Sequence, residues 1–213
     1  MNVREVYQHF NTPPNLQEHM NRVTVIVMFI RDNCKGQEIN WNNLIVAALL
    51  HDLGNIVRFN FDQNTNIYGA EANRLDYWKA KKQEMIEKYG ADDHEATQNM
   101  LREINADPAV VENILSKSFA NSEEIAKSDN WVNKILLYAD MRVLPDRIGT
   151  LKQRLDELKS RRADLANDPS FIAKISALEQ LEKQIQENLS VPVTSITNDL
   201  MERYKVDLDD YDL

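Results

Sequence analysis

The sequence contains few of the residues that build disulfide frameworks, β-hairpins or membrane spans. It has one cysteine, Cys34, so no disulfide can form within the chain, which fits a reducing compartment. Five glycines and six prolines are few for 213 residues, and this composition favours helices over hairpin-rich β structure. The longest apolar run, VTVIVMFI at 23–30, is too short to span a bilayer, and the N-terminus lacks the pattern of a signal peptide. We therefore expect a soluble, cytoplasmic, all-α protein.

Basic residues are outnumbered by acidic ones. The chain has 25 Lys and Arg against 34 Asp and Glu, which gives a formal net charge of −9. This balance argues against a nucleic-acid polymer or an anionic membrane as a partner. A small anionic substrate remains compatible with it, because a bound metal together with Arg or Lys can reverse the sign of the field inside one cleft.

Helical periodicity and capping residues predict a series of helices before residue 147. Their expected bounds are 2–10, 16–33, 41–53, 70–89, 92–104, 107–118 and 131–144. Gly54 is expected to end the helix at 41–53, and Pro145 to break the helix at 131–144. The segment 58–69 has turn-forming residues and no helical period, which predicts a loop.

After residue 147 the sequence changes to long polar helices with apolar residues along one side. This pattern predicts an antiparallel helical hairpin at 148–190, whose apolar seam could pack on the rest of the chain or on a second copy in a homodimer. A short helix near 194–205 follows, and the acidic tail at 207–213 is expected to be a solvated chain end. We therefore predict a domain at 1–147 and a C-terminal extension at 148–213.

Four ionisable side chains occupy positions where helical spacing predicts a buried apolar face. They are His19, His51, Asp52 and Asp140. His19, for example, is separated by helical spacing from Val23 and Ile26. Each residue alone has an ordinary explanation, such as a hydrogen-bonded core histidine, a polar helix end, or a carboxylate paired with arginine. Together they suit one divalent cation, namely manganese, iron, nickel, cobalt, zinc or magnesium, with positions left open for water and substrate.

The segments that carry these residues resemble a known family. HMNRV at 19–23, LLHDLGN at 49–55 and LLYADMRV at 136–143 are similar to the ordered His, His-Asp, Asp pattern of the HD-domain superfamily of metal-dependent phosphohydrolases. The resemblance covers residues 16–147 and implies a helical bundle at 1–147, the HD domain. It also implies that His19, His51, Asp52 and Asp140 are the metal ligands.

Two positions bear on the number of metals. His94 resembles a histidine that some members of the superfamily use for a second metal or for substrate, and it can equally be an exposed residue in the first turn of a helix. Members with two metals carry another histidine downstream, where this chain has ILSKSFANSEE at 114–124. This departure favours one metal.

The chemistry expected of such a site is attack of metal-activated water on phosphorus. The candidate catalytic residues are Asp52, His94 and Arg22, and the candidate substrate-binding residues are Arg22, Asn55, Arg142 and Lys117. For Lys117 and for Arg58, which follows the His-Asp pair, a salt-bridged surface position is the competing interpretation. The leading hypothesis is a phosphomonoesterase or phosphodiesterase acting on a small, nucleotide-like substrate. One alternative is a non-catalytic regulatory protein that binds metal or nucleotide and uses its C-terminal helices for partners; another is a helical adaptor without a site.

Overall fold

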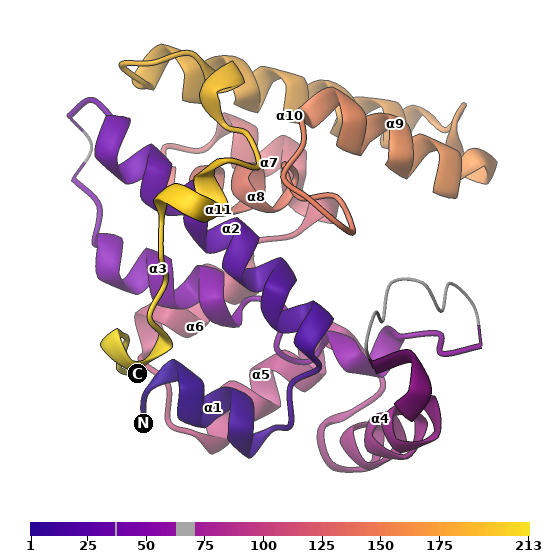
Figure 1. Cartoon of the computed structure of the whole chain (residues 1–213). Helices are drawn as coiled ribbons and strands as arrows, with labels where there is room; N and C mark the ends of the chain where they lie inside the picture. Colours follow the sequence, from indigo (N-terminus) through magenta and orange to yellow (C-terminus); the bar gives the residue numbers. More distant parts are fainter. Residues whose placement is uncertain (37, 63–70) are drawn as a thin grey trace. The chain divides into compact units, whose positions relative to one another are not determined.

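The computed structural model describes residues 1–36, 38–62 and 71–213. Within these residues it contains α-helices, short 3₁₀ turns and no β-strand, which confirms the all-α prediction (Figure 1). The chain divides into two compact units. Unit 1 consists of Met1–Asn21, Val46–Leu115 and Asp207–Leu213, and unit 2 of Arg22–Ile45 and Ser116–Val206. This division differs from the predicted boundary after residue 147, because the C-terminal helices pack with residues that precede that boundary.

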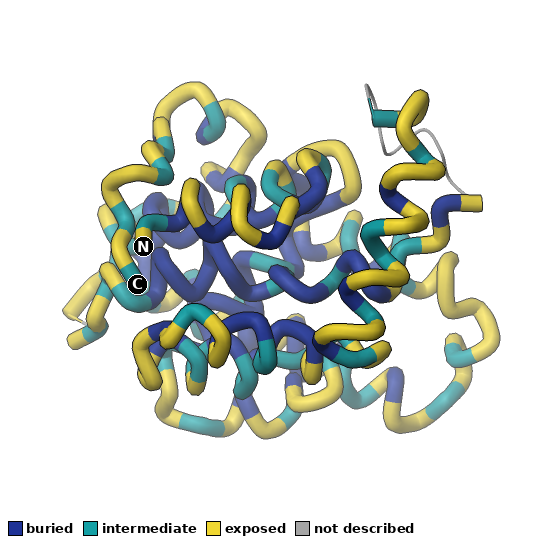
Figure 2. Tube along the Cα trace, turned by 90° about the horizontal axis from the view of Figure 1, so that it is seen from below, coloured by how far each residue is buried: buried dark blue, intermediate teal, exposed yellow. Residues whose placement is uncertain are grey.

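Unit 1 holds the N-terminal helix, three later helices and one end of each of two others. These are α1 (Val3–His9), α4 (Leu75–Tyr89), α5 (Asp93–Glu103), α6 (Pro108–Ser116), the start of α2 (Pro14–Asn33) and the end of α3 (Trp41–Leu50). Asn2 and Glu5 form a capping box on α1, and Asp92 caps α5 by accepting from the Glu95 backbone N–H. Among the described residues, the longest buried stretches are 22–30 in α2, which belongs to unit 2, and 44–51, which covers the end of α3 and His51 (Figure 2).

Unit 2 contains the C-terminal helices and the middle of the chain. Its elements are the rest of α2 and α3, then α7 (Ser122–Lys127), α8 (Trp131–Asp140), α9 (Leu151–Arg161), α10 (Pro169–Asn188) and α11 (Leu200–Arg203). Helix α10 packs against α7 and α8 and buries Phe171, Ile175, Leu178, Leu181 and Ile185. Of the two packings that the sequence left open for the hairpin, the structure has the one within the chain.

The acidic tail is tied to the N-terminus, while its carboxylates stay exposed, as expected of a solvated end. The Val3 backbone N–H donates to the Tyr211 carbonyl oxygen at 3.0 Å. The Arg4 guanidinium lies 2.8 Å from Asp209 and 3.2 Å from Asp207. The two chain ends therefore lie side by side in unit 1 (Figure 1). The tail is ordered because its carboxylates have a cation to bind.

Two helices that carry site residues end earlier than periodicity predicts. Helix α8 stops at Asp140 rather than at residue 144, and α3 stops at Leu50 rather than at residue 53. Gly54 lies at φ −84°, so it does not end α3 as a left-handed cap. It instead allows close approach of α5, because a Cβ at this position would lie 2.5 Å from the Thr97 backbone nitrogen. Hydrophobic periodicity continues through both turns, and it therefore overestimates the length of each helix.

Two further predictions differ at their edges. Helix α4 begins at Leu75, after a 3₁₀ turn at 71–74, rather than at residue 70, and the chain reaches the predicted loop through a 3₁₀ turn at Asn55–Arg58. Part of the predicted loop at 58–69 lies outside the described residues. Among those that are described, no helix combines the length and the apolar composition that crossing a bilayer requires.

Candidate metal centre

His51 lies in the turn directly after α3, and its imidazole is fixed by the helix that precedes it. Its Nδ1 lies 2.8 Å from the Ala48 carbonyl oxygen, one helical turn earlier. A carbonyl oxygen only accepts hydrogen bonds, so Nδ1 carries the proton in this contact, and in a neutral imidazole Nε2 then carries the lone pair. The side chain is fully buried, at 0% exposure. The backbone thus selects the tautomer that metal-binding histidines use.

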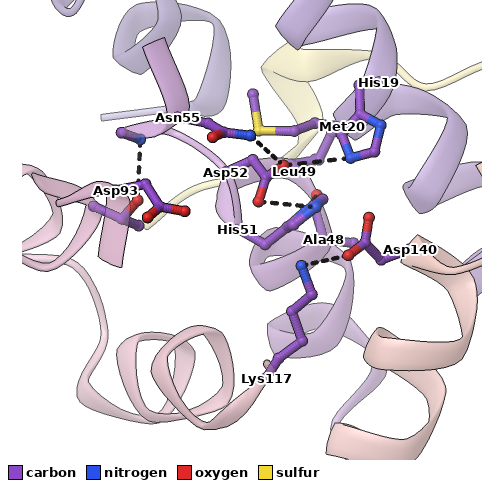
Figure 3. Close-up of polar contacts among 12 residues, drawn as sticks. His19, Met20, Ala48, Leu49, His51, Asp52, Asn55, Asp93, Lys117 and Asp140 are labelled. Atoms are coloured by element: carbon purple, nitrogen blue, oxygen red, sulfur yellow. Dashed lines mark hydrogen bonds and ion pairs between the residues drawn. The ribbon is translucent and has the colours of Figure 1, made fainter. Parts of the chain in front are cut away.

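Asp52 lies between two imidazoles. Its Oδ1 is 3.5 Å from His51 Nε2, and its Oδ2 is 3.5 Å from His19 Nε2 (Figure 3). The rings of His19 and His51 are 5.3 Å apart. Asn55, at the start of the 3₁₀ turn, donates from Nδ2 to Asp52 Oδ2 at 3.0 Å and so orients the carboxylate. Two imidazoles and one carboxylate therefore converge within unit 1.

At 3.5 Å, the approaches between Asp52 and the two imidazoles are longer than the 2.7–3.2 Å typical of a hydrogen bond. Imidazole nitrogens and a carboxylate gathered in this way are groups that a divalent cation can bind.

Asp140, the last residue of α8, lies in unit 2 beside a buried lysine. Lys117 Nζ is 2.7 Å from Asp140 Oδ2, and the two side chains are 9% and 17% exposed (Figure 3). The ammonium therefore compensates one carboxylate oxygen. This contact favours the salt-bridged interpretation of Lys117 over a position that faces substrate.

Three of the four predicted ligands bring their donor atoms close enough together to share one metal ion. His19, His51 and Asp140 form a group that could hold a metal ion. Two imidazole nitrogens and one carboxylate oxygen suit a divalent transition metal, and three protein ligands are typical of catalytic sites. The fourth predicted ligand, Asp52, is not a member of this group. Its contacts include those to the two histidines and to Asn55.

Arg142 is held by the fold of unit 2 and does not line an opening. Its side chain is among the largest fully buried ones, and Nε donates to the Gly149 carbonyl at 2.7 Å. The other guanidinium nitrogens donate to the Tyr138 hydroxyl at 2.6 Å and to the Val193 and Ile196 carbonyls at 3.3 and 2.8 Å. A phosphate would have to displace these partners. We therefore do not place Arg142 among the substrate-binding residues.

The remaining candidates fall into two groups. Arg22 is 7% exposed and follows His19 by one turn of α2. His94 is exposed in the first turn of α5, and Arg58 is an exposed residue paired with Asp93 at 3.2 Å. For His94 and Arg58 the structure favours the surface interpretation.

Sequence reasoning missed the contacts that support this cluster. Nothing in the sequence pattern indicates that His51 binds the Ala48 carbonyl. The two residues are three positions apart, so a side chain just past the end of α3 can reach this carbonyl in the last turn of the helix. The contact of Gly54 with Thr97, in which the Gly54 N–H donates to the threonine hydroxyl at 3.0 Å, has no signal in the sequence, because the two residues are 43 positions apart. Asn55 was predicted to bind substrate, and it binds Asp52.

Comparisons with known proteins give this chain no relative. No protein-family model, curated protein or solved structure matches it. The argument for function therefore depends on the chemistry of the site and on the sequence pattern alone.

Proposed function

We propose that this protein is a metal-dependent phosphohydrolase that removes or cleaves a phosphate ester on a small, nucleotide-like substrate. One divalent cation is held by His19, His51 and Asp140. The observation that carries the proposal is the buried His51 imidazole, whose Nδ1 is bound by the Ala48 carbonyl and whose Nε2 faces Asp52 at 3.5 Å. The ordered His, His-Asp, Asp pattern of the HD-domain superfamily supports these three ligands and implies Asp52 as a fourth.

The donor set fits a cation because each ligand is already oriented by a neighbour. Ala48 fixes the His51 tautomer, and Lys117 holds the Asp140 carboxylate through Oδ2. A bound divalent cation polarises a phosphoryl oxygen and acidifies water.

Asp52 is the proposed proton acceptor of the reaction. It keeps partial solvent access, at 23% exposure, and Asn55 fixes the direction of its carboxylate. A carboxylate held at the mouth of a site can take a proton from an attacking water. Arg22, one helical turn after His19, is the proposed partner of the substrate phosphate, because a guanidinium can bind two phosphate oxygens at once.

The test is a hydrolysis assay on protein purified without chelator and supplied with Mn²⁺. The panel contains nucleoside monophosphates, cyclic nucleotides and simple phosphomonoesters. We expect turnover of at least one member and a loss of about 100-fold or more in kcat/KM in His19→Gln and in Asp52→Asn. His94→Ala is the matched control, because it removes a histidine that lies exposed on α5, and its rate should stay within about 2-fold of the unmodified protein.

Two outcomes contradict the proposal in different ways. If the protein binds Mn²⁺ and hydrolyses no member of the panel, the non-catalytic regulatory alternative replaces it. If hydrolysis occurs and His19→Gln retains full activity, the reaction takes place elsewhere on the chain.

A further inference from the structure

Unit 1 contains a hollow that none of the candidate metal ligands lines. Its volume is ≈ 410 Å³, which falls in the range of about 300–1,000 Å³ typical of small-molecule sites. The walls come from α1, the turn between α1 and α2, the first turns of α2, the start of α4, and Leu208 of the C-terminal tail. Three stretches of unit 1, at 4–17, at 74–78 and at Leu208, therefore build one concave surface.

The charged side chains at this hollow are neutralised by their own neighbours. Arg4 is bound by Asp207 and Asp209 of the tail, and Arg74 by Glu71 at 3.0 Å. The two positive charges thus face three carboxylates that already bind them. This balance favours an uncharged ligand over a phosphate or a carboxylate.

An exposed aromatic ring stands at the hollow. Tyr77 is one of the few large hydrophobic side chains with high exposure, at 36%. The Arg74 guanidinium covers its ring at 4.6 Å, and Trp78 meets it edge-on at 4.9 Å between centroids. A tyrosine held in this way offers a fixed planar surface on which a flat ligand can stack.

The rest of the lining supplies uncharged donors and acceptors. Gln8, Asn11 and Gln17 each bring a side-chain amide. Gln17 donates from Nε2 to the Thr12 carbonyl at 2.7 Å, so its Oε1 is left as an acceptor.

We propose that this hollow is a binding site for the base of a nucleoside, separate from the metal centre. A nucleobase is flat, uncharged at neutral pH, and carries donors and acceptors along one edge, which matches a stacking tyrosine and three amides. Tyr7, which also lines the hollow, donates from its hydroxyl to the Leu49 carbonyl of α3.

Calorimetric titration of the full chain with adenosine, guanosine, cytidine and uridine tests the proposal. Nucleosides are used because they carry no phosphate for the metal centre. We expect at least one of them to bind with a Kd below about 1 mM. Tyr77→Ala should weaken that binding by about 5-fold or more through loss of stacking. Gln8→Leu should weaken it as well, because it removes one of the three amides that line the hollow.

Lys152→Ala, which changes an exposed residue of α9 in unit 2, is the matched control and should bind as the unmodified protein does. The proposal is overturned if no nucleoside binds with a Kd below about 1 mM, or if binding is unaffected by both Tyr77→Ala and Gln8→Leu. Either result leaves the phosphohydrolase proposal standing, since its residues do not line this hollow.

Discussion

Two buried polar clusters of this protein, one around Arg142 in unit 2 and one around His51 in unit 1, are built in opposite ways. The Arg142 guanidinium meets four oxygen atoms at 2.6–3.3 Å, and the Tyr138 hydroxyl that it contacts continues the chain to Glu182 at 3.0 Å. Burial raises the pKa of the Tyr138 hydroxyl, so this side chain stays neutral and serves as a hydrogen-bond relay. Every contact in this cluster joins a donor to an acceptor.

Around His51 the contacts have a different character. The imidazole is fixed on one side by a carbonyl, and on the other side its Nε2 faces a carboxylate oxygen at 3.5 Å. The comparison teaches that burial of a charged residue alone does not mark a functional site. What distinguishes the two clusters is the kind of groups that they bring together: one guanidinium with the oxygens that accept from it around Arg142, and two imidazoles with a carboxylate, groups that bind metal ions, around His51.

The largest expected effect is in the cluster around Arg142. Arg142→Met removes a cation and leaves the Gly149, Val193 and Ile196 carbonyls buried without their donor. We expect a loss of about 3–5 kcal/mol in the free energy of unfolding, measured by urea denaturation. Arg147→Met, at an exposed arginine five residues later, should change it by less than about 0.5 kcal/mol. A loss below about 1 kcal/mol in Arg142→Met would mean that this cluster is not structural.

The next effect concerns the backbone of the turn that contains His51 and Gly54. Gly54→Ala puts a methyl group 2.5 Å from the Thr97 backbone nitrogen and 2.9 Å from the Ala96 Cβ. Since backbone cannot move aside cheaply, we expect a loss of about 1–3 kcal/mol in stability, and weaker metal binding because the turn at His51 shifts. Thermal unfolding and metal titration check the two parts. Unchanged values in both would show that α5 does not position this turn.

A smaller effect is expected at Asn55, which binds Asp52 beside His51 and is not a proposed metal ligand. Asn55→Ala frees the Asp52 carboxylate, which Asn55 binds at 3.0 Å. We expect kcat to fall about 10-fold with little change in KM, as is typical when an orienting partner is lost. Asn121→Ala, at an exposed asparagine that makes no capping bond, is the control. An equal fall in both variants would remove the orienting role of Asn55.

The smallest effect lies in an exposed ion cluster of unit 1. Hydrogen bonds from His9, Lys88 and Tyr89 lower the pKa of the Glu103 carboxyl to about 2. Because the folded pKa is lower than the unfolded one, near 4.5, this residue stabilises the fold above pH 4.5, and the contribution is lost as the pH falls toward 2.

Glu103→Gln should therefore be less stable than the unmodified protein at pH 7, by less than about 1 kcal/mol because the cluster is partly exposed. The difference should shrink between pH 4.5 and pH 2. Urea denaturation at a series of pH values measures it, with Glu187→Gln on the outer face of α10 as the control. A difference that grows on acidification has the wrong sign for this account.

The helices could be predicted from the sequence because their caps and periodicity are local. Asn2, Asp92 and Asp168 all cap helices that begin where the sequence indicates. Helix ends were less accurate, as Asp140 and Leu50 show, because apolar spacing continues beyond the last helical hydrogen bond. The packing of the acidic tail on α1 could not be predicted, since Arg4 and Asp209 are 205 residues apart.

The sequence predicted which residues form the candidate site, but not the contacts that they make. His19, His51 and Asp140 were singled out because ionisable residues on apolar helix faces need a partner, and these three form the group that could hold a metal ion. The role of Lys117 was not predictable, because an isolated lysine gives no sign of which carboxylate it will meet. Arg142 was assigned to substrate for the same reason, since its four oxygen partners come from three different segments of unit 2.

The most direct test of the central claim is the amount of metal that the chain retains. Equilibrium dialysis against Mn²⁺ followed by elemental analysis gives the number of ions per chain for the unmodified protein, His19→Gln, His51→Gln and His94→Ala, each checked for folding by circular dichroism. The account predicts about one ion per chain in the unmodified protein and in His94→Ala, and almost none in folded His19→Gln or His51→Gln. Retention of the ion by both folded ligand variants, or no ion in the unmodified protein, would contradict it.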